Sequence, residues 1–318
     1  MNLVELEPIK ISRDLKGKYI LLYSLPKAGK TSLAAQFPKS LILGFEKGYN
    51  GLAGVMAVDI PKWSQMKEVL RELRKPEVQE KFDTIVVDTA TIAWELCEQF
   101  ICMQNDVEEI NQLSWGKGYK LCAKEFNTTM RQITMLGYGL VFIAHSEEKP
   151  IPDGQEGETF VAPSLEKRAY KIINGMVDII GYIQVDLETG KRTLITRANK
   201  HIVAGSRFRF LPAEIELSYE NLANALADAI EKEGTASGGM IVDARLNEVT
   251  TKRNFDETLK EAANLWQQLV SKNENNLSEM QKIIKNHFGE IVKLSEAKES
   301  QQDLVELVIY DFKELLTE

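Results

Sequence analysis

The sequence predicts an α/β fold in which helices flank a mostly parallel central sheet, followed by a small all-helical domain at the C-terminus. Short apolar segments of β-preferring residues recur along the first two thirds of the chain, and amphipathic segments with helical spacing separate them. Strands that alternate with helices form parallel sheets, because each helix carries the chain back across the sheet. Near the C-terminus only helical periodicity remains.

The composition is that of a globular protein. The chain has 318 residues, of which 44% are hydrophobic and 27% charged, enough for one core and a small second domain. No apolar run approaches the roughly 18 residues of a membrane span, and residues 1–18 lack the apolar region of a secretory signal. We therefore expect a cytoplasmic protein with no membrane partner.

Cysteine content and net charge limit which kinds of site and partner the protein can have. Cys97, Cys102 and Cys122 are odd in number and lack C-x-x-C spacing, which argues against a disulfide framework and against zinc and favours packing roles. The net charge is −8, of which residues 231–318 carry −6 and residues 1–230 carry −2. Any contact with nucleic acid must therefore come from a local patch.

The segment 18–35, KYILLYSLPKAGKTSLAA, carries the strongest motif. An apolar strand at 19–23 leads into a turn at 24–29 and a helix that starts at Lys30. This order is that of a P-loop, in which backbone N–H groups wrap phosphates, a lysine bridges the terminal phosphates and a hydroxyl ligates Mg²⁺. We assign nucleotide binding to the turn and the helix start, with Lys30 on the phosphates and Thr31 on Mg²⁺: Ser24, Leu25, Pro26, Lys27, Ala28, Gly29, Lys30, Thr31 and Ser32.

Ser24 departs from the pattern G-x-x-x-x-G-K-[ST], whose first position is glycine. Serine is small enough to end a strand, but it resists a positive φ. If this position needs a left-handed conformation, the loop is strained or reshaped and turnover is lowered. The alternative is that A-G-K-T-S begins a helix by chance, although strand, turn and helix all fall where the motif needs them.

Two acids follow further apolar strands. Residues 40–45 form a strand that ends at Glu46, and residues 84–87 form another that ends at Asp88. Strand carboxyl ends face the ligand in parallel sheets, so Glu46 could polarise the attacking water and Asp88 could hold Mg²⁺ in the Walker B manner. A solvated acid in the turn EKGYNG and a helix N-cap, respectively, are the alternatives.

A third strand end carries a histidine. Helices at 92–103 and 115–136 precede the strand at 139–144, which ends at His145. A polar side chain here can sense the γ-phosphate, or it can simply be satisfied at the sheet margin. Residues 146–163 are polar and aperiodic and predict a long loop that responds to nucleotide or touches a polymer substrate.

Cations and aromatic residues alternate after a predicted helix at 165–174 and a hairpin of strands 178–185 and 192–196. The cations are Arg197, Lys200, His201, Arg207 and Arg209. This pattern suits phosphates or single strands, or an arginine finger that reaches into a neighbour's ATP site; a solvated strand edge is the alternative.

The C-terminal part predicts a separate domain. A helix at 219–233 is followed by the flexible stretch GTASGG, so we divide the chain into a core at 1–233, a linker at 234–246 and a helical domain at 247–318. The last domain is acidic, has three amphipathic segments and shows no catalytic constellation. We expect it to bind protein partners or to support oligomerisation.

The ordered set YSLPKAGKTSLAAQFP, LILGFEKG, TIVVDT, WGKGY, GLVFIAHSEEK and VDIIGYI resembles phage-encoded nucleotide-binding proteins of the short RecA-like ATPase group, which includes Sak-type single-strand-annealing and recombination-mediator proteins. The resemblance covers residues 18–212 and not the helical tail. It implies a RecA-like core in which Glu46 is the catalytic glutamate, Asp88 the Walker B acid and His145 the sensor. It also implies that 146–163 faces DNA and that Arg207 acts in trans.

By this resemblance the chain binds ATP and Mg²⁺ and acts as an ATPase on single-stranded DNA in phage replication or recombination. Homo-oligomers with ATP at subunit interfaces, and replication or recombination proteins held by the C-terminal domain, are the implied partners. A nucleotide-gated adaptor with little turnover remains an alternative. A P-loop kinase is disfavoured because no arginine cluster lies between Asp88 and His145, and a GTPase because the N-K-x-D motif is missing.

Overall fold

The computed structural model describes residues 11–152, 155, 157–239, 241–242, 254–273, 276–290 and 292–317. The chain divides into two compact units, Met1–Val249 and Thr250–Glu318. Residues 240 and 243–246 of the predicted linker and 247–253 of the predicted helical domain lie outside the described residues. Among the described helices, none combines the length and the apolar character needed to cross a membrane.

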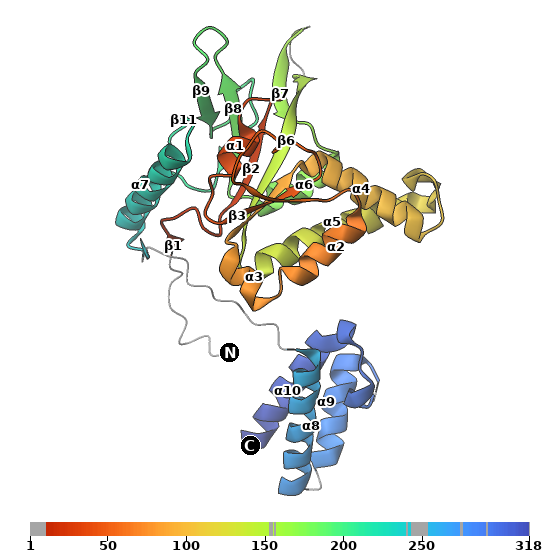
Figure 1. The fold of residues 1–318 in the computed structure, drawn as a ribbon. Helices are drawn as coiled ribbons and strands as arrows, with labels where there is room; N and C mark the ends of the chain where they lie inside the picture. The colour runs from red at the N-terminus through yellow and green to blue at the C-terminus, as the bar shows by residue number, and fades with distance from the viewer. Residues whose placement is uncertain are drawn as a thin grey trace. The chain divides into compact units, whose positions relative to one another are not determined.

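The first unit is built on a ten-stranded sheet (Figure 1) whose main path runs β11-β9-β8-β2-β6-β5-β3-β4. From β4 to β8 along this path neighbouring strands are parallel, while the β8–β9 and β9–β11 pairs are antiparallel. The strands are β2 (Tyr19–Ser24), β3 (Ser40–Gly44), β4 (Met56–Asp59), β5 (Thr84–Asp88), β6 (Gly139–Pro150), β7 (Thr159–Pro163), β8 (Ile179–Val185), β9 (Arg192–Ile195), β10 (Gly205–Ser206) and β11 (Glu214–Glu216). The predicted class, a mostly parallel central sheet with flanking helices, is confirmed.

The central strands are apolar along their whole length because both faces of the sheet are covered. In β2, Leu21 and Tyr23 point into one hydrophobic cluster, whereas Ile20 and Leu22 point into the other. This alternation follows from the two-residue period of a strand. The buried run at the start of the P-loop motif therefore anchors that motif in the middle of the sheet.

Helices cover both faces (Figure 1). The larger cluster lies under α2 (Trp63–Glu72), α4 (Ala90–Gln104), α5 (Lys117–Met135) and α6 (Lys167–Met176), and α3 (Pro76–Lys81) follows α2. The 3-10 turns Ile110–Gln112 and Ser114–Gly116 lie between α4 and α5. The second cluster lies under α1 (Lys30–Ala34) and α7 (Tyr219–Ser237).

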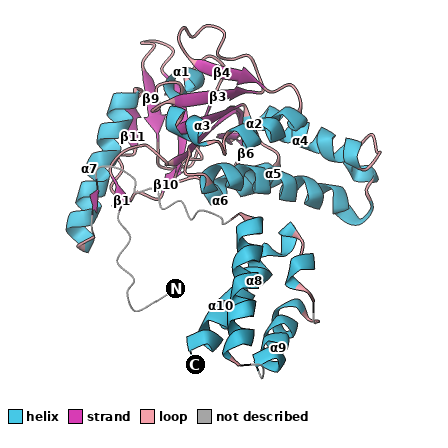
Figure 2. Cartoon of the chain, turned by 60° about the horizontal axis from the view of Figure 1, so that its bottom comes forward, coloured by secondary structure: helices cyan, strands magenta, loops and turns pink. Residues whose placement is uncertain are grey.

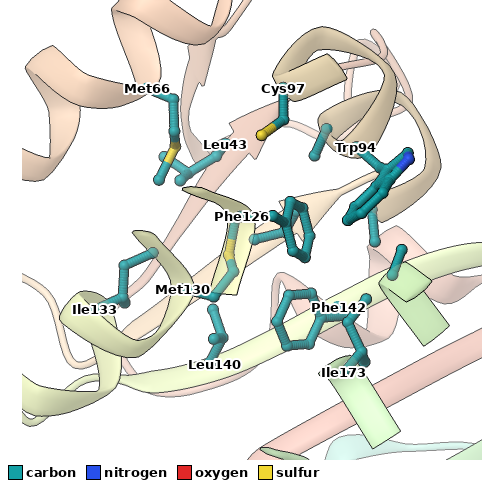
Figure 3. Close-up of a cluster of buried hydrophobic side chains, with 14 of the residues drawn as sticks. Leu43, Met66, Trp94, Cys97, Phe126, Met130, Ile133, Leu140, Phe142 and Ile173 are labelled. Carbon is teal, nitrogen blue, oxygen red and sulfur yellow. The ribbon is translucent and has the colours of Figure 1, made fainter. Parts of the chain in front are cut away.

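The larger cluster is centred on Phe126 of α5, which has Trp94, Met130 and Phe142 around it (Figure 3). Its ring stacks with Trp63 at 5.9 Å between centroids and meets Trp94 edge-on at 5.3 Å. The three cysteines are all buried, as predicted for packing residues.

The predicted loop 146–163 is wrong over most of its length. β6 continues to Pro150 and pairs with antiparallel β7, from Ser146 opposite Pro163 to Pro150 opposite Thr159. The sequence predicts a loop here because the segment is polar and charged. The hairpin can carry these residues because it extends past the buried part of β6, where alternate side chains are exposed to solvent. Edge strand β4, exposed along its length, was also not predicted.

The helix predicted to end at residue 233 continues to Ser237, so the predicted linker begins inside α7. A Cβ added to Gly234 would lie 2.3 Å from Ile241 Cδ1, which shows that the isoleucine side chain packs where this glycine has none. Ile241 and Val242 form β12, which pairs in parallel with β1 (Ile11–Ser12). Gly234, the first residue of the predicted linker, therefore lies in a helix and packs against Ile241.

The second unit contains α8 (Phe255–Lys272), α9 (Asn276–Phe288) and α10 (Gln302–Thr317), with 3-10 turns at Leu294–Glu296 and Glu299–Gln301 (Figure 2). The three helices share their own hydrophobic core, centred on Leu269, Met280 and Phe312. The predicted C-terminal helical region is confirmed.

Candidate active site

The predicted catalytic residues gather at one edge of the sheet. Ser24 is paired with His145 between β2 and β6, and Asp88 is paired with Ile143 between β5 and β6. Gly44, two residues before Glu46, is paired with Asp88. Because these strands are parallel and in register, their carboxyl ends bring the P-loop, Glu46, Asp88 and His145 together.

The P-loop turn places its left-handed residues at Lys27, with φ 63°, and Gly29, with φ 104°. Ser24 is the last residue of β2, buried and outside the left-handed region. The strain considered for a serine in place of glycine therefore does not arise at this position. Its hydroxyl instead donates to Leu25 O over 3.0 Å and accepts from Lys30.

Lys30 is buried inside the turn. Its Nζ donates to Leu25 O at 2.8 Å, to Ser24 O at 3.1 Å and to Ser24 Oγ at 3.2 Å. Burial lowers the pKa of Lys30 to about 8, and the nearby carboxylates of Asp88 and Glu46 act in the opposite direction. The ammonium thus lies among neutral acceptors, where a phosphate would give it an anionic partner.

Thr31 and Asp88 meet directly, because Thr31 Oγ1 donates to Asp88 Oδ2 over 2.8 Å. Burial, together with the nearby Glu46 carboxylate, raises the pKa of Asp88, and the Thr31 hydrogen bond and the Lys30 charge only partly oppose this shift. Gly48 covers the pair: a Cβ there would lie 3.2 Å from Asp88 Oδ2 and 3.4 Å from Thr31 Oγ1.

A hydroxyl and one carboxylate under a glycine fit Mg²⁺, which commonly takes one or two protein oxygens and completes its shell with phosphates and water. Within the described part of the chain, no group of three His, Cys, Asp or Glu side chains is placed to hold a metal without such help. The donor set at this edge therefore suits a nucleotide-bound cation rather than a resident one.

Glu46 is held from two sides. Thr89 Oγ1 donates to Glu46 Oε1 over 2.8 Å, and His145 Nε2 lies 3.4 Å from Glu46 Oε2. The backbone N–H of Glu46 also donates to Asp88 O over 3.0 Å. Both carboxylate oxygens have side-chain neighbours, which distinguishes Glu46 from a freely solvated turn acid.

Arg192 at the start of β9 also reaches this edge, and sequence reasoning missed it. A Cβ added to Gly29 would lie 3.1 Å from Arg192 Nη1, so the guanidinium lies against the P-loop. Arg192 is exposed, and among the described residues no carboxylate lies within ion-pair distance of it. Only the register of β8 and β9 against β2 brings the two segments together, and no local motif signals that register.

Arg207 is not brought to this edge. Its Nη1 lies 3.2 Å from Asp178 Oδ1, and its Nη2 donates to Gly175 O over 3.0 Å. Asp178 directly precedes β8, whose first residues pair with the beginning of β2. Arg207 therefore lies at the amino-end edge of the sheet, opposite the P-loop of the same chain.

Comparison with known proteins gives a family and a full-length relative. Residues 16–208, more than half of the chain, match the family described as AAA domain. The SPbeta prophage-derived uncharacterized protein YorG of Bacillus subtilis (strain 168) is 27% identical over 320 residues, covering 97% of this chain and 96% of that protein.

Two solved structures show lower similarity. The RadB recombinase covers 65% of this chain and 90% of its own, with a TM-score of 0.39 and 13% identity. A KaiC-like protein from Pyrococcus horikoshii OT3 covers 59% of this chain and 88% of its own, with a TM-score of 0.34 and 13% identity.

Proposed function

This chain belongs to the AAA domain family, and from that premise we propose that it binds ATP with Mg²⁺ and hydrolyses it at the edge formed by β2, β3, β5 and β6. The contact between Thr31 Oγ1 and Asp88 Oδ2 beside Lys30 carries this proposal. This contact brings the P-loop hydroxyl and the Walker B acid together beside the phosphate-binding lysine, as phosphoryl transfer requires.

The residues of the site have separate roles in binding the nucleotide. Backbone N–H groups of the turn 24–29 and the Lys30 ammonium bind the phosphates, and Thr31 and Asp88 would hold Mg²⁺. When bound, Mg²⁺ supplies neutralisation of phosphate charge. The chain itself contributes mainly positioning, because the strand ends fix these groups before the nucleotide arrives.

Glu46 orients the attacking water and accepts its proton. The water oxygen forms a bond to the γ-phosphorus, and the bond from that phosphorus to the ADP oxygen breaks, so ADP and phosphate leave. Thr89 and His145 position the Glu46 carboxylate. His145 also lies in β6 directly before the β6–β7 hairpin begins. A change in its contact with the γ-phosphate would therefore alter the start of that hairpin.

We further propose that hydrolysis is coupled to single-stranded DNA in phage replication or recombination, in the cytoplasm of the host. The similarity to a prophage-derived protein along almost the whole chain supports a phage setting. The β6–β7 hairpin, at 146–163, is the segment that would face the DNA.

Oligomerisation would complete the site. Arg207 lies at the sheet edge opposite the P-loop, so copies stacked with one edge on the other would bring it to a neighbour's ATP. The second unit would hold replication or recombination proteins. An adaptor with little turnover is the second candidate, because both Glu46 oxygens are already engaged within the chain.

Steady-state ATP hydrolysis, measured with and without single-stranded DNA across a salt series, tests this function. Stimulation that fades as salt rises is expected, because phosphate contacts are salt-dependent. Hydrolysis indifferent to DNA would favour the adaptor. No measurable affinity for ATP, or a Lys30→Ala variant with unchanged affinity and hydrolysis, would overturn the proposal.

A further inference from the structure

The solvent face of α5 carries charges of one sign. Lys117, Lys120, Lys124 and Arg131 are exposed and lie three, four and seven residues apart, which places them along one side of the helix. We call these four residues the α5 basic stripe. The first three have no carboxylate within ion-pair distance among the described residues, in a chain whose net charge is −8.

The one acid of α5 belongs to a different contact. Glu125 accepts from Trp63 Nε1 at 2.9 Å and from Lys67 Nζ at 2.6 Å, both in α2. It therefore faces the neighbouring helix and does not neutralise the stripe.

The stripe opposes the stability of its own helix. Like charges three and four residues apart repel each other, and Lys117 and Lys120 lie in the first turn, where the helix dipole disfavours cations. That turn contains no acid. Local rules are broken in this way mainly at functional sites, and four cations on one side of a helix would suit a polyanion.

Trp115 lies at the beginning of the stripe. This residue is 97% exposed, and its backbone is left-handed with φ 58°, two residues before α5 begins. The joined ends of α4 and α5 that carry it extend away from the sheet (Figure 2). A large aromatic side chain that is exposed in this way offers a free ring face.

The neighbouring helix α6 also carries exposed cations. Lys167 and Lys171 are exposed there, and Arg168 lies over the Tyr119 ring of α5 at 4.4 Å. Arg168 Nη1 also pairs with Glu166 Oε1 at 3.0 Å, so of these α6 cations only Lys167 and Lys171 have no carboxylate within ion-pair distance among the described residues.

We infer that Trp115 and the α5 basic stripe bind single-stranded DNA, with the lysines on phosphates and the indole ring stacked on a base. This inference rests on the proposed DNA role and gives it a surface outside the ATP site. An unpaired base exposes the face that an aromatic ring needs, whereas duplex DNA keeps that face stacked internally. The same physics makes the binding tolerant of base sequence.

Fluorescence anisotropy of a labelled oligothymidylate tests the stripe with the full-length protein. The triple variant Lys117→Gln, Lys120→Gln, Lys124→Gln removes three phosphate contacts, so the slope of log affinity against log salt should fall by about 2. The matched control Lys62→Gln, Lys75→Gln, Lys81→Gln removes three exposed charges elsewhere and should keep the slope. Because repulsion is relieved, the stripe variant should melt no lower than the wild type.

The ring is tested separately. Trp115→Ala should weaken oligothymidylate binding about ten-fold or more, while Trp115→Phe retains most of the affinity. Met103→Ala, at another exposed apolar residue near the end of α4, is the matched control and should bind as the wild type does. Oligothymidylate should also quench tryptophan fluorescence of the wild type more than that of Trp115→Phe.

The outcomes separate the two proposals. Wild-type protein that fails to bind oligothymidylate would overturn both the DNA role and this surface. Wild-type binding that the stripe and Trp115 variants retain in full would overturn the surface alone. Equal competition by duplex DNA or by polyglutamate would also overturn it, since neither offers an unpaired base.

Discussion

Thr89 Oγ1 donates a hydrogen bond of 2.8 Å to Glu46 Oε1, so the residue that follows Asp88 fixes the acid that follows β3. The ends of two adjacent strands are thereby tied together through side chains as well as through the Glu46 N–H bond to Asp88 O. The proposed catalytic role of the Glu46 carboxylate can be tested by removing its basicity while keeping its shape.

Glu46→Gln should reduce ATP hydrolysis about 10²- to 10⁴-fold, because the amide still accepts from Thr89 but cannot take a proton from water. ATP affinity should stay close to that of the wild type. Single-turnover hydrolysis and equilibrium binding of ATP measure the two effects. Glu80→Gln, at an exposed position of α3, controls for loss of a charge, and a Glu46→Gln variant with normal turnover would remove Glu46 from the mechanism.

Gly48→Ala should weaken Mg²⁺-dependent ATP binding, because its Cβ would lie 3.2 Å from Asp88 Oδ2, where the cation and its waters need room. Gly51→Ala, in the same loop, has no atom within 4 Å of its new Cβ and should behave as the wild type. Titration of ATP affinity against Mg²⁺ concentration measures the difference. Equal Mg²⁺ dependence in the two variants would place the cation elsewhere.

ATP affinity should fall as the pH rises above about 8. Burial lowers the pKa of Lys30 to about 8, so above this pH an increasing fraction of free protein carries a neutral Lys30, whereas bound phosphates favour the charged form. Binding in this range should therefore take up a proton. Calorimetry in two buffers with different ionisation enthalpies measures that uptake, and an affinity that stays constant from pH 7 to pH 9.5 would contradict it.

Arg192→Gln should weaken ATP binding about ten-fold, because its guanidinium lies beside Gly29 of the P-loop and a charge-assisted hydrogen bond to phosphate contributes about 1.5–3 kcal/mol. Tripolyphosphate, which has no base, should show the same loss. Arg71→Gln, exposed on α2, is the control. If the loss appeared with ATP but not with tripolyphosphate, Arg192 would contact the base or the sugar instead.

Phe126→Ala should destabilise the first unit by about 3–5 kcal/mol, because it empties the space between Trp63 and Trp94. Urea unfolding followed by tryptophan fluorescence is suited to this measurement, since both flanking tryptophans report on the same cluster. Met135→Ala, at a residue that is 49% exposed near the end of the same helix, should change stability by less than about 0.5 kcal/mol. Similar losses in both variants would indicate a poorly packed cluster.

Much of the site could be predicted because its signals are local. The P-loop is a continuous run from strand to helix, and Glu46, Asp88 and His145 each follow a short apolar strand. Parallel pairing then brings those ends together, which requires no knowledge of the exact register.

The remaining features depend on contacts between distant segments. Arg192 reaches Gly29 only through the pairing of β9 with β8 and of β8 with β2. The β6–β7 hairpin was mistaken for a loop because its charged strand lies beyond the buried sheet, where apolar periodicity is lost. The composition around Gly234 predicts a flexible segment because it does not reveal that Ile241 packs against this glycine.

The short ribbon of β1 and β12 has a practical consequence for separating the two units. Ile241 contacts Gly234 and pairs with Ile11, so the strand that follows α7 belongs to the first unit. Truncation at Glu233 would strip this strand away and leave Ile11 and Ser12 without their partner. A stop codon placed after Val242 would preserve the ribbon while still deleting the entire helical tail.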